Sequence, residues 1–80
     1  MGDQHDLDLL NIFHRLVRLL GDTGKKIDDQ TTWSDLGMND TAVTTFVQVQ
    51  CRNEFGIRLD RSDAGKTVSD LAVSIHNALG

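Results

Sequence analysis

The sequence predicts an all-α domain that folds as a small helical bundle. A chain of 80 residues forms one small domain, and folding at this size buries only about 60% of the surface that the unfolded chain exposes. The chain has no proline, and its Val, Thr and aromatic residues do not alternate with polar residues as in a strand. Apolar residues instead recur at helical spacing. We therefore expect residues 1–80 to form a single domain with few long-range pairings.

The first helix is predicted in the segment DLDLLNIFHRLVRLLG, residues 6–21. Asp8 near its start and Arg18 near its end have the charges that the helix dipole favours at each terminus. Gly21 is suited to ending the helix. Its predicted apolar stripe consists of Leu9, Leu10, Phe13, Leu16, Val17 and Leu20.

A long loop is predicted from Gly21 to Asn39, because this stretch has no sustained hydrophobic period. Ile27, Trp33 and Leu36 are spaced along it and are expected to pin it onto the bundle. Trp33 is the main anchor, since burial of a large aromatic side chain contributes a few kcal/mol. A loop of this length in a compact domain is more often functional than idle.

A second helix is predicted after this loop, with Asn39 or Asp40 as its N-cap and Gly56 at its end. Thr and Val are mediocre helix formers, so tertiary packing must supply much of the stability of this helix. Its apolar face consists of Val43, Phe46, Val47, Cys51 and Phe55.

Two further helical segments are predicted near the end of the chain. A short helical turn is expected near Ser62 to Ala64. A last helix follows Thr67, which acts as its cap in a near capping box with Asp70. The apolar stripe of this last helix consists of Val68, Leu71, Ala72, Ile75 and Leu79.

The composition indicates a cytoplasmic protein that does not bind nucleic acid. A formal net charge of −4 argues against attraction to nucleic acid or to anionic membranes. No segment approaches the roughly 20 apolar residues of a membrane span, and the acidic N-terminus is unlike a secretory signal. The single cysteine fits a reducing compartment. A monomer is compatible with these features.

Neither a metal site nor an enzyme active site is expected. His5, His14 and His76 lack the spacing of metal ligands. Cys51 lies on the apolar face of the second predicted helix, which favours a packed thiol over a nucleophile. A catalytic subunit in which Cys51 acts with His14 or His76 as base is kept as an alternative of another class.

Several short sequence segments resemble acyl carrier proteins. They occur in the same order as in that family and extend along essentially the whole chain. The family pattern reads roughly D-L-G-x-D-S-L, a helix, F-G-I-x-[IL], a D-A-x-K turn and a final helix opening near T-V-x-D. The matching residues here are Asp35-Leu36-Gly37, Phe55-Gly56-Ile57 with Leu59, Asp63-Ala64 with Lys66, and Val68 with Asp70.

This resemblance implies a four-helix bundle with a long loop after the first helix and a short third helix. In the family, the Ser of D-S-L at the start of helix 2 carries a 4'-phosphopantetheine arm, on which acyl groups are presented to synthase or transferase partners. The placement is physically reasonable, because a helix N-terminus offers free amides and partial positive charge to the phosphodiester. Carriers of the family also present several acidic side chains on helix 2.

The chain departs from the family pattern at the attachment residue. Asp40 occupies the serine position when counted forward from Gly37, and Thr41 occupies it when counted back from Phe55, because the interval is one residue longer than usual. Asp40 and Thr41 are therefore the candidate cofactor positions. Thr41 has a hydroxyl, but its β-branched side chain hinders attack. We expect no cofactor, with 4'-phosphopantetheine on Thr41 as the alternative.

The resemblance and this departure together predict a non-enzymatic partner in fatty-acid or polyketide-type acyl metabolism that acts by protein binding. The Asp40 carboxylate is expected to cap the second helix and to imitate the phosphodiester. The second predicted helix has few acids, so electrostatic steering toward enzyme partners should be weak. The expected partner-binding residues are Asp35, Met38, Asp40, Thr44 and Gln48.

Overall fold

The computed structural model describes residues 8–21, 24 and 26–79. Segments α3, η1 and α4 follow one another without a break, so these residues form four helices. The elements are α2 (Leu9–Leu20), α3 (Asp40–Thr45), the π-helical segment η1 (Phe46–Cys51), α4 (Arg52–Phe55), α5 (Arg61–Ala64) and α6 (Val68–Leu79). The described ranges contain no β-strand, and their extended pairing is limited to a bridge between Thr32 and Thr67. The prediction of a mostly helical domain is confirmed.

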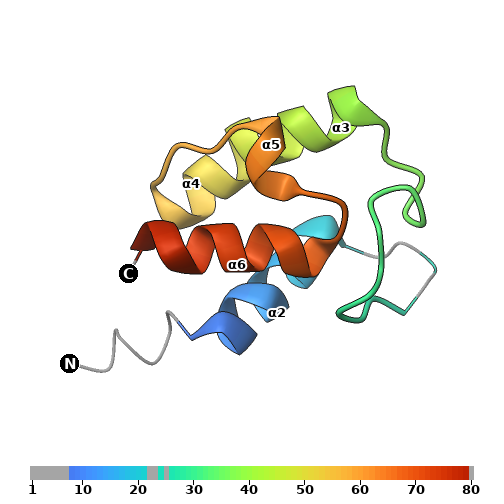
Figure 1. Ribbon diagram of the computed structural model, residues 1–80, viewed down its shortest axis with the longest axis horizontal. Helices are drawn as coiled ribbons and strands as arrows, with labels where there is room; N and C mark the ends of the chain where they lie inside the picture. Colours follow the sequence, from blue (N-terminus) through green and yellow to red (C-terminus); the bar gives the residue numbers. More distant parts are fainter. Residues whose placement is uncertain (1–7, 22–23, 25, 80) are drawn as a thin grey trace.

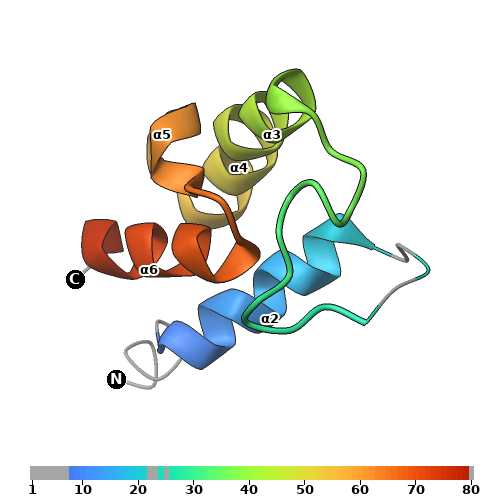
Figure 2. The same cartoon turned by 45° about the vertical axis from the view of Figure 1, so that its right-hand side comes forward.

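The helix α6 lies in the middle of the arrangement. It packs against α2 on one side and against α5 on the other, while α5 also contacts α3 and η1 (Figures 1 and 2). The loop between α2 and α3 passes along one end of these helices (Figure 2). The radius of gyration is 11.7 Å, close to the value of about 12 Å expected for a compact domain of this length.

The helix α2 confirms the predicted first helix but corrects its apolar stripe. Ile12 and Leu16 are its fully buried residues. Leu9 is 41% exposed and Leu10 is 64% exposed, although both were expected in the core. Leu10 lies about 200° around the helix from Ile12, so it points away from the face that α2 buries.

The predicted anchor of the long loop is confirmed. Trp33 is 2% exposed, and its Nε1 donates a hydrogen bond of 3.0 Å to the carbonyl oxygen of Ala64. Its ring meets that of Phe46 at a tilt, with the centroids 5.9 Å apart. The Trp33 amide donates to the carbonyl of Lys66, and the Val68 amide donates to that of Thr31. The loop is therefore joined to the start of α6 by both backbone and side chain.

The second helix extends from Asp40 to Phe55, and its middle segment η1 is π-helical. Its buried residues Val43, Val47 and Cys51 are four residues apart. In a regular α-helix each such step overshoots one turn by about 40°, which would carry the last residue away from the core. The wider π-helical turn of η1 removes this drift, because its hydrogen bonds span one more residue. This π-helical segment was not predicted from the sequence.

The predicted cap of Thr67 and Asp70 at the start of α6 is confirmed. The same cap also requires glycine at position 65. The Asp70 amide donates to Thr67 Oγ1 at 3.0 Å, and Asp70 Oδ2 accepts from the amides of Lys66 and Thr67 at 2.9 and 3.1 Å. These bonds, led by the one from Lys66, hold the pKa of Asp70 below its usual value. Gly65 has φ +58°, and a Cβ there would lie 2.6 Å from the Cβ of Asp70. Only glycine fits this approach.

The core is made by one continuous cluster of buried side chains. All three longer helices, the loop and α5 contribute to it. Its members are Ile12, Leu16, Trp33, Val43, Phe46, Val47, Cys51, Leu59, Ala64, Val68, Leu71, Ala72 and Ile75. The fold therefore holds the loop, the start of the second helix and α5 in fixed positions around one core.

Candidate functional site at the start of the second helix

A hollow of about 320 Å³ lies where the long loop enters α3. The loop supplies most of its wall, and α5 together with the residues before α6 supplies two cationic side chains. We call this feature the helix-start hollow. Its lining residues are Thr32, Trp33, Ser34, Met38, Asn39, Asp40, Arg61 and Lys66.

Asp40 is the first residue of α3, and its carboxylate is 88% exposed at the rim of the helix-start hollow. Arg61 Nε donates to Asp40 Oδ1 at 3.1 Å, which makes this contact both a hydrogen bond and an ion pair. The same guanidinium donates through Nη1 to the carbonyl oxygen of Gly65 at 2.9 Å. The Arg61 guanidinium is therefore held by two hydrogen bonds within the chain. The anion that it binds is the carboxylate of Asp40.

The expectation that Asp40 caps the second helix is wrong. Asn39 is the N-cap, and its Oδ1 accepts a hydrogen bond of 2.8 Å from the amide of Ala42. A side chain must stand just before the first helical residue to reach that amide, and Asp40 is already inside the helix. The Asp40 carboxylate is still an anion in the first turn, where the helix dipole favours it.

Thr41 is exposed on the first turn of α3. It does not line the helix-start hollow. If a phosphodiester were attached here, Arg61 and Lys66 would be the nearby cations of the hollow, and Arg61 already pairs with Asp40. The two candidate cofactor positions are therefore adjacent in the chain but differ in surroundings.

The other predicted partner-binding residues are divided among three places. Met38 is partly buried and lines the helix-start hollow beside Asp40. Asp35 accepts from the Thr32 amide at 3.1 Å, while its own amide donates to Thr32 Oγ1 at 3.0 Å, so it stabilises the loop turn. Thr44 is partly buried on α3, and Gln48 lines a second hollow. The structure brings Met38 and Asp40 together, but not the whole set.

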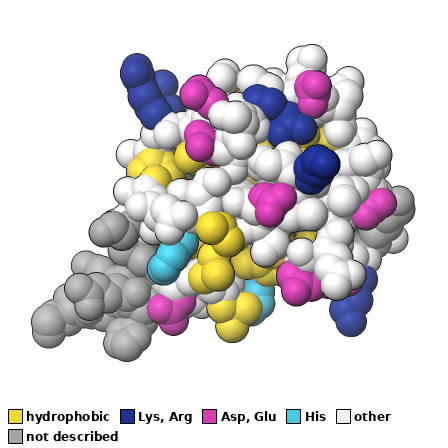
Figure 3. All heavy atoms as spheres, viewed as in Figure 1, with side chains coloured by type: hydrophobic (Ala, Val, Ile, Leu, Met, Phe, Trp, Pro, Cys, Tyr) yellow, Lys and Arg dark blue, Asp and Glu magenta, His cyan; other side chains and the backbone are white. Residues whose placement is uncertain are grey.

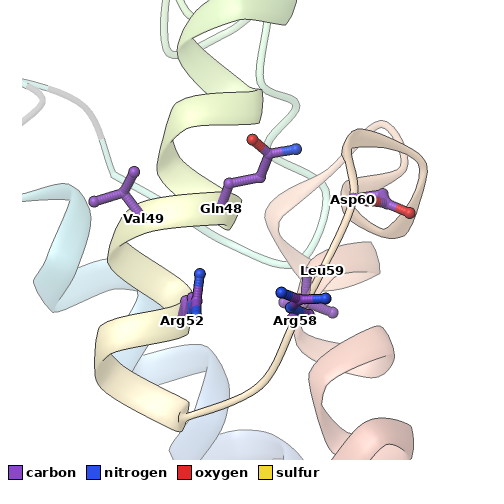
Figure 4. A pocket seen from close by; sticks show the side chains of 6 residues that line it. All are labelled: Gln48, Val49, Arg52, Arg58, Leu59 and Asp60. Carbon is purple, nitrogen blue, oxygen red and sulfur yellow. The ribbon is translucent and has the colours of Figure 1, made fainter.

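The second hollow has a volume of about 370 Å³ and lies between the second helix and the segment that leads from Gly56 to α5. We call it the arginine hollow. Figure 4 shows Arg52 on the helix and Arg58 on the following segment at its two sides. Its lining residues are Gln48, Val49, Arg52, Arg58, Leu59 and Asp60. This pair of arginines was not predicted from the sequence, because no local spacing brings a residue of a helix next to one in the following turn.

Cys51 is packed inside the core. It is fully buried, and this burial raises the pKa of its thiol to about 12, so the thiolate is not formed near neutral pH. His14 and His76 are both exposed, while His5 lies outside the described residues. Among the residues that the structure describes, no three His, Cys, Asp or Glu side chains are grouped so that they could hold a metal ion.

The surface gives no extended patch of one charge on the side viewed in Figure 3, where acidic and basic side chains are intermixed. No helix within the described ranges is long and apolar enough to cross a membrane. No protein-family model matches the chain, and no significant match is found among curated proteins or solved structures. The function is therefore argued from the residues and their geometry.

Proposed function

We propose that this domain is an acyl-carrier-like, non-enzymatic partner in fatty-acid or polyketide-type acyl metabolism. It folds as a four-helix bundle of the acyl-carrier type, lacks a phosphopantetheine arm and acts in the cytoplasm by binding synthase or transferase enzymes. The resemblance of the DLG, FGI and D-A-x-K segments supports this proposal. So does the order of elements, in which a long loop precedes the second helix and a short α5 precedes α6.

The residues that carry the resemblance have structural roles consistent with this proposal. Leu36, Phe55 and Ile57 pack against the core cluster. Gly37 and Gly56 have φ of +72° and +71°, which are values that glycine adopts at little cost. Lys66 bonds through its amide to Asp70 at the start of α6. Each matched segment is thus a turn or a core contact of this domain.

The π-helical segment also offers a place for the extra residue between Gly37 and Phe55. A π-helical turn contains one more residue within each hydrogen-bonded ring than an α-helical turn. One residue added to a helix of the family length can therefore be absorbed in η1 while Val43 and Phe55 both remain on the core side. This accounts for an altered spacing without any change at either end of the helix.

The single observation that carries the arm-less proposal is the ion pair between Asp40 and Arg61. A carboxylate stands at the first turn of the second helix, where the family places a phosphodiester, and Arg61 Nε approaches it to 3.1 Å. The helix start therefore has an anion without any modification. Such a domain presents an ion-paired carboxylate at the helix start to partner enzymes.

The proposal is tested by intact mass spectrometry after incubation with a broad phosphopantetheinyl transferase and coenzyme A. We expect the wild-type mass to stay unchanged. The Asp40→Ser and Thr41→Ser variants are matched substrates, because each places a serine at one of the two attachment positions. Modification of either variant shows that the transferase accepts this fold, and the unchanged wild type then supports an arm-less domain.

The alternative is a true carrier in which Thr41 bears the arm. The exposure of Thr41 on the first turn of α3 favours this second candidate. A wild-type mass increased by one arm, and lost in the Thr41→Ala variant, would establish it and overturn the arm-less proposal. The Cys51 catalytic alternative has no such support, since its thiol is fully buried with a pKa near 12.

A further inference from the structure

The arginine hollow is lined by two arginines and one carboxylate, that of Asp60, which pairs with neither arginine. Neither Arg52 nor Arg58 forms an ion pair or a side-chain hydrogen bond with a described residue, whereas Arg15 and Arg61 each pair with a carboxylate. Both are exposed, and both line the hollow, Arg52 from the helix and Arg58 from the segment that follows it (Figure 4). Like charges placed together repel each other, and a bound anion between them would relieve this repulsion.

The chemistry of the walls indicates what kind of anion fits. A guanidinium presents N–H donors in a planar fork that matches the two oxygens of a carboxylate. The carboxamide of Gln48 adds a neutral donor at the rim, and the nearly buried Leu59 provides an apolar floor. The hollow is therefore suited to a carboxylate carried on a partly apolar chain.

A phosphate group is less suited to the same position. Arg52 begins the last turn of the second helix, so the nearby helix terminus has the negative end of the dipole. Asp60 adds a carboxylate to the rim, and its amide already donates to Asp63 Oδ2 at 2.8 Å. A doubly charged anion meets more repulsion here than a carboxylate.

The neighbouring surface indicates a protein partner. Val49 lines the hollow and is 51% exposed, and Figure 4 shows its side chain extending to the side of the helix away from Arg58. A small anion would leave Val49 uncovered. A protein surface that lies across η1 and α4 would cover Val49 while one of its acidic side chains enters the hollow.

We propose that the arginine hollow is a docking site for an acidic segment of a partner protein, with an Asp or Glu side chain of the partner between Arg52 and Arg58. The polarity is opposite to the acidic second helix that the family resemblance implies. The inference depends only on the geometry and charge of this hollow, so it stands independently of the proposed function.

The test is an NMR titration of the ¹⁵N-labelled protein with the blocked peptide Ac-Ala-Leu-Glu-Leu-Glu-Ala-NH2. We expect the side-chain Nε–Hε signals of Arg52 and Arg58 to shift in a saturable manner, with a Kd of about 1 mM or below. Arg52→Gln and Arg58→Gln should each weaken binding about fivefold. Arg18→Gln, on exposed Arg18 outside the hollow, is the matched control and should leave the Kd unchanged.

Three results would overturn the proposal. The first is equal binding of the peptide in which Gln replaces Glu, since the carboxylate would then play no part. The second is a larger response of both arginines to inorganic phosphate than to the peptide at the same ionic strength. The third is an equal loss of affinity in the Arg18→Gln control, which would indicate nonspecific charge attraction. Circular dichroism confirms that each variant is folded, as expected for exposed arginines without internal partners.

Discussion

The helix-start hollow and the arginine hollow differ in whether their arginines are paired with a carboxylate. In the first, Arg61 is held between the Asp40 carboxylate and the carbonyl of Gly65. In the second, Arg52 and Arg58 have no such partner among the described residues. In one hollow the fold thus pairs an arginine with a carboxylate, while in the other neither arginine is paired, although Asp60 lies in the wall. Both hollows contain arginines, so the presence of an arginine does not by itself define a binding site. What distinguishes the two hollows is whether the fold places a carboxylate against the guanidinium.

The largest expected effect comes from removing the wall of the helix-start hollow. Trp33→Ala deletes a buried indole and its hydrogen bond to Ala64, and should lower the free energy of unfolding by about 3–5 kcal/mol. Urea denaturation followed by circular dichroism measures this loss. Ser34→Ala, at the exposed neighbouring position, should change the stability by less than about 0.5 kcal/mol. Equal stabilities of the two variants would disprove the anchoring role of Trp33.

A smaller effect is expected at the cap that precedes Asp40. Asn39→Ala removes the acceptor for the Ala42 amide and should cost about 1 kcal/mol. Asn53→Ala, at an exposed position inside α4, is the control and should be neutral or slightly stabilising, because Ala favours helix. Thermal melts of both variants measure the difference. If Asn39→Ala were as stable as Asn53→Ala, the assignment of the cap would be incorrect.

The Asp70 carboxylate at the start of α6 should make part of the free energy of unfolding depend on pH. Hydrogen bonds, first from the Lys66 amide, lower the pKa of Asp70 in the folded protein. Asp70 therefore stabilises the fold above the unfolded pKa of about 3.9, and this contribution is lost as the pH falls through the lower folded pKa. Asp70→Asn should be less stable than wild type at about pH 7, and the two should converge near pH 2. A difference that stays constant over this range would refute the linkage.

The smallest expected effect compares the arginines of the two hollows directly. A double-mutant cycle of Asp40→Asn and Arg61→Gln should give a favourable coupling of about 0.2–1 kcal/mol, because the pair is largely exposed. The cycle of Arg52→Gln and Arg58→Gln should give zero or unfavourable coupling, since like charges repel. Both cycles are measured by urea denaturation. Favourable coupling of similar size in both would remove the distinction between the hollows.

Much of the fold could be predicted because its signals are local. The glycines after α2 and α4, the Asn39 cap and the Thr67–Asp70 capping box each act within a few residues. The π-helical segment η1 was harder to predict. The four-residue spacing of Val43, Val47 and Cys51 is nevertheless consistent with a wider helical turn. The two steps from Val43 to Cys51 in a regular helix would have turned the face by about 80°.

The candidate site could be predicted only where its residues are consecutive. Asp40 and Thr41 follow from the DLG segment, but the ion pair to Arg61 joins residues 21 apart in the chain. Arg58 and Arg52 line the same hollow because the chain turns at Gly56. The glycine predicts that the helix ends there, but it does not predict the direction in which the chain continues. Contacts of this kind depend on how the elements pack, and no periodic pattern encodes them.

The central claim is that the start of the second helix is charged by Asp40 rather than by an arm. The most direct measurement is the intact mass of the polypeptide that carries this domain, purified from the cells that make it, with fragments that cover Ser34 to Thr44. We expect the unmodified mass for these fragments. A fragment that carries one phosphopantetheine arm on Thr41 would contradict the account and identify the domain as a working carrier.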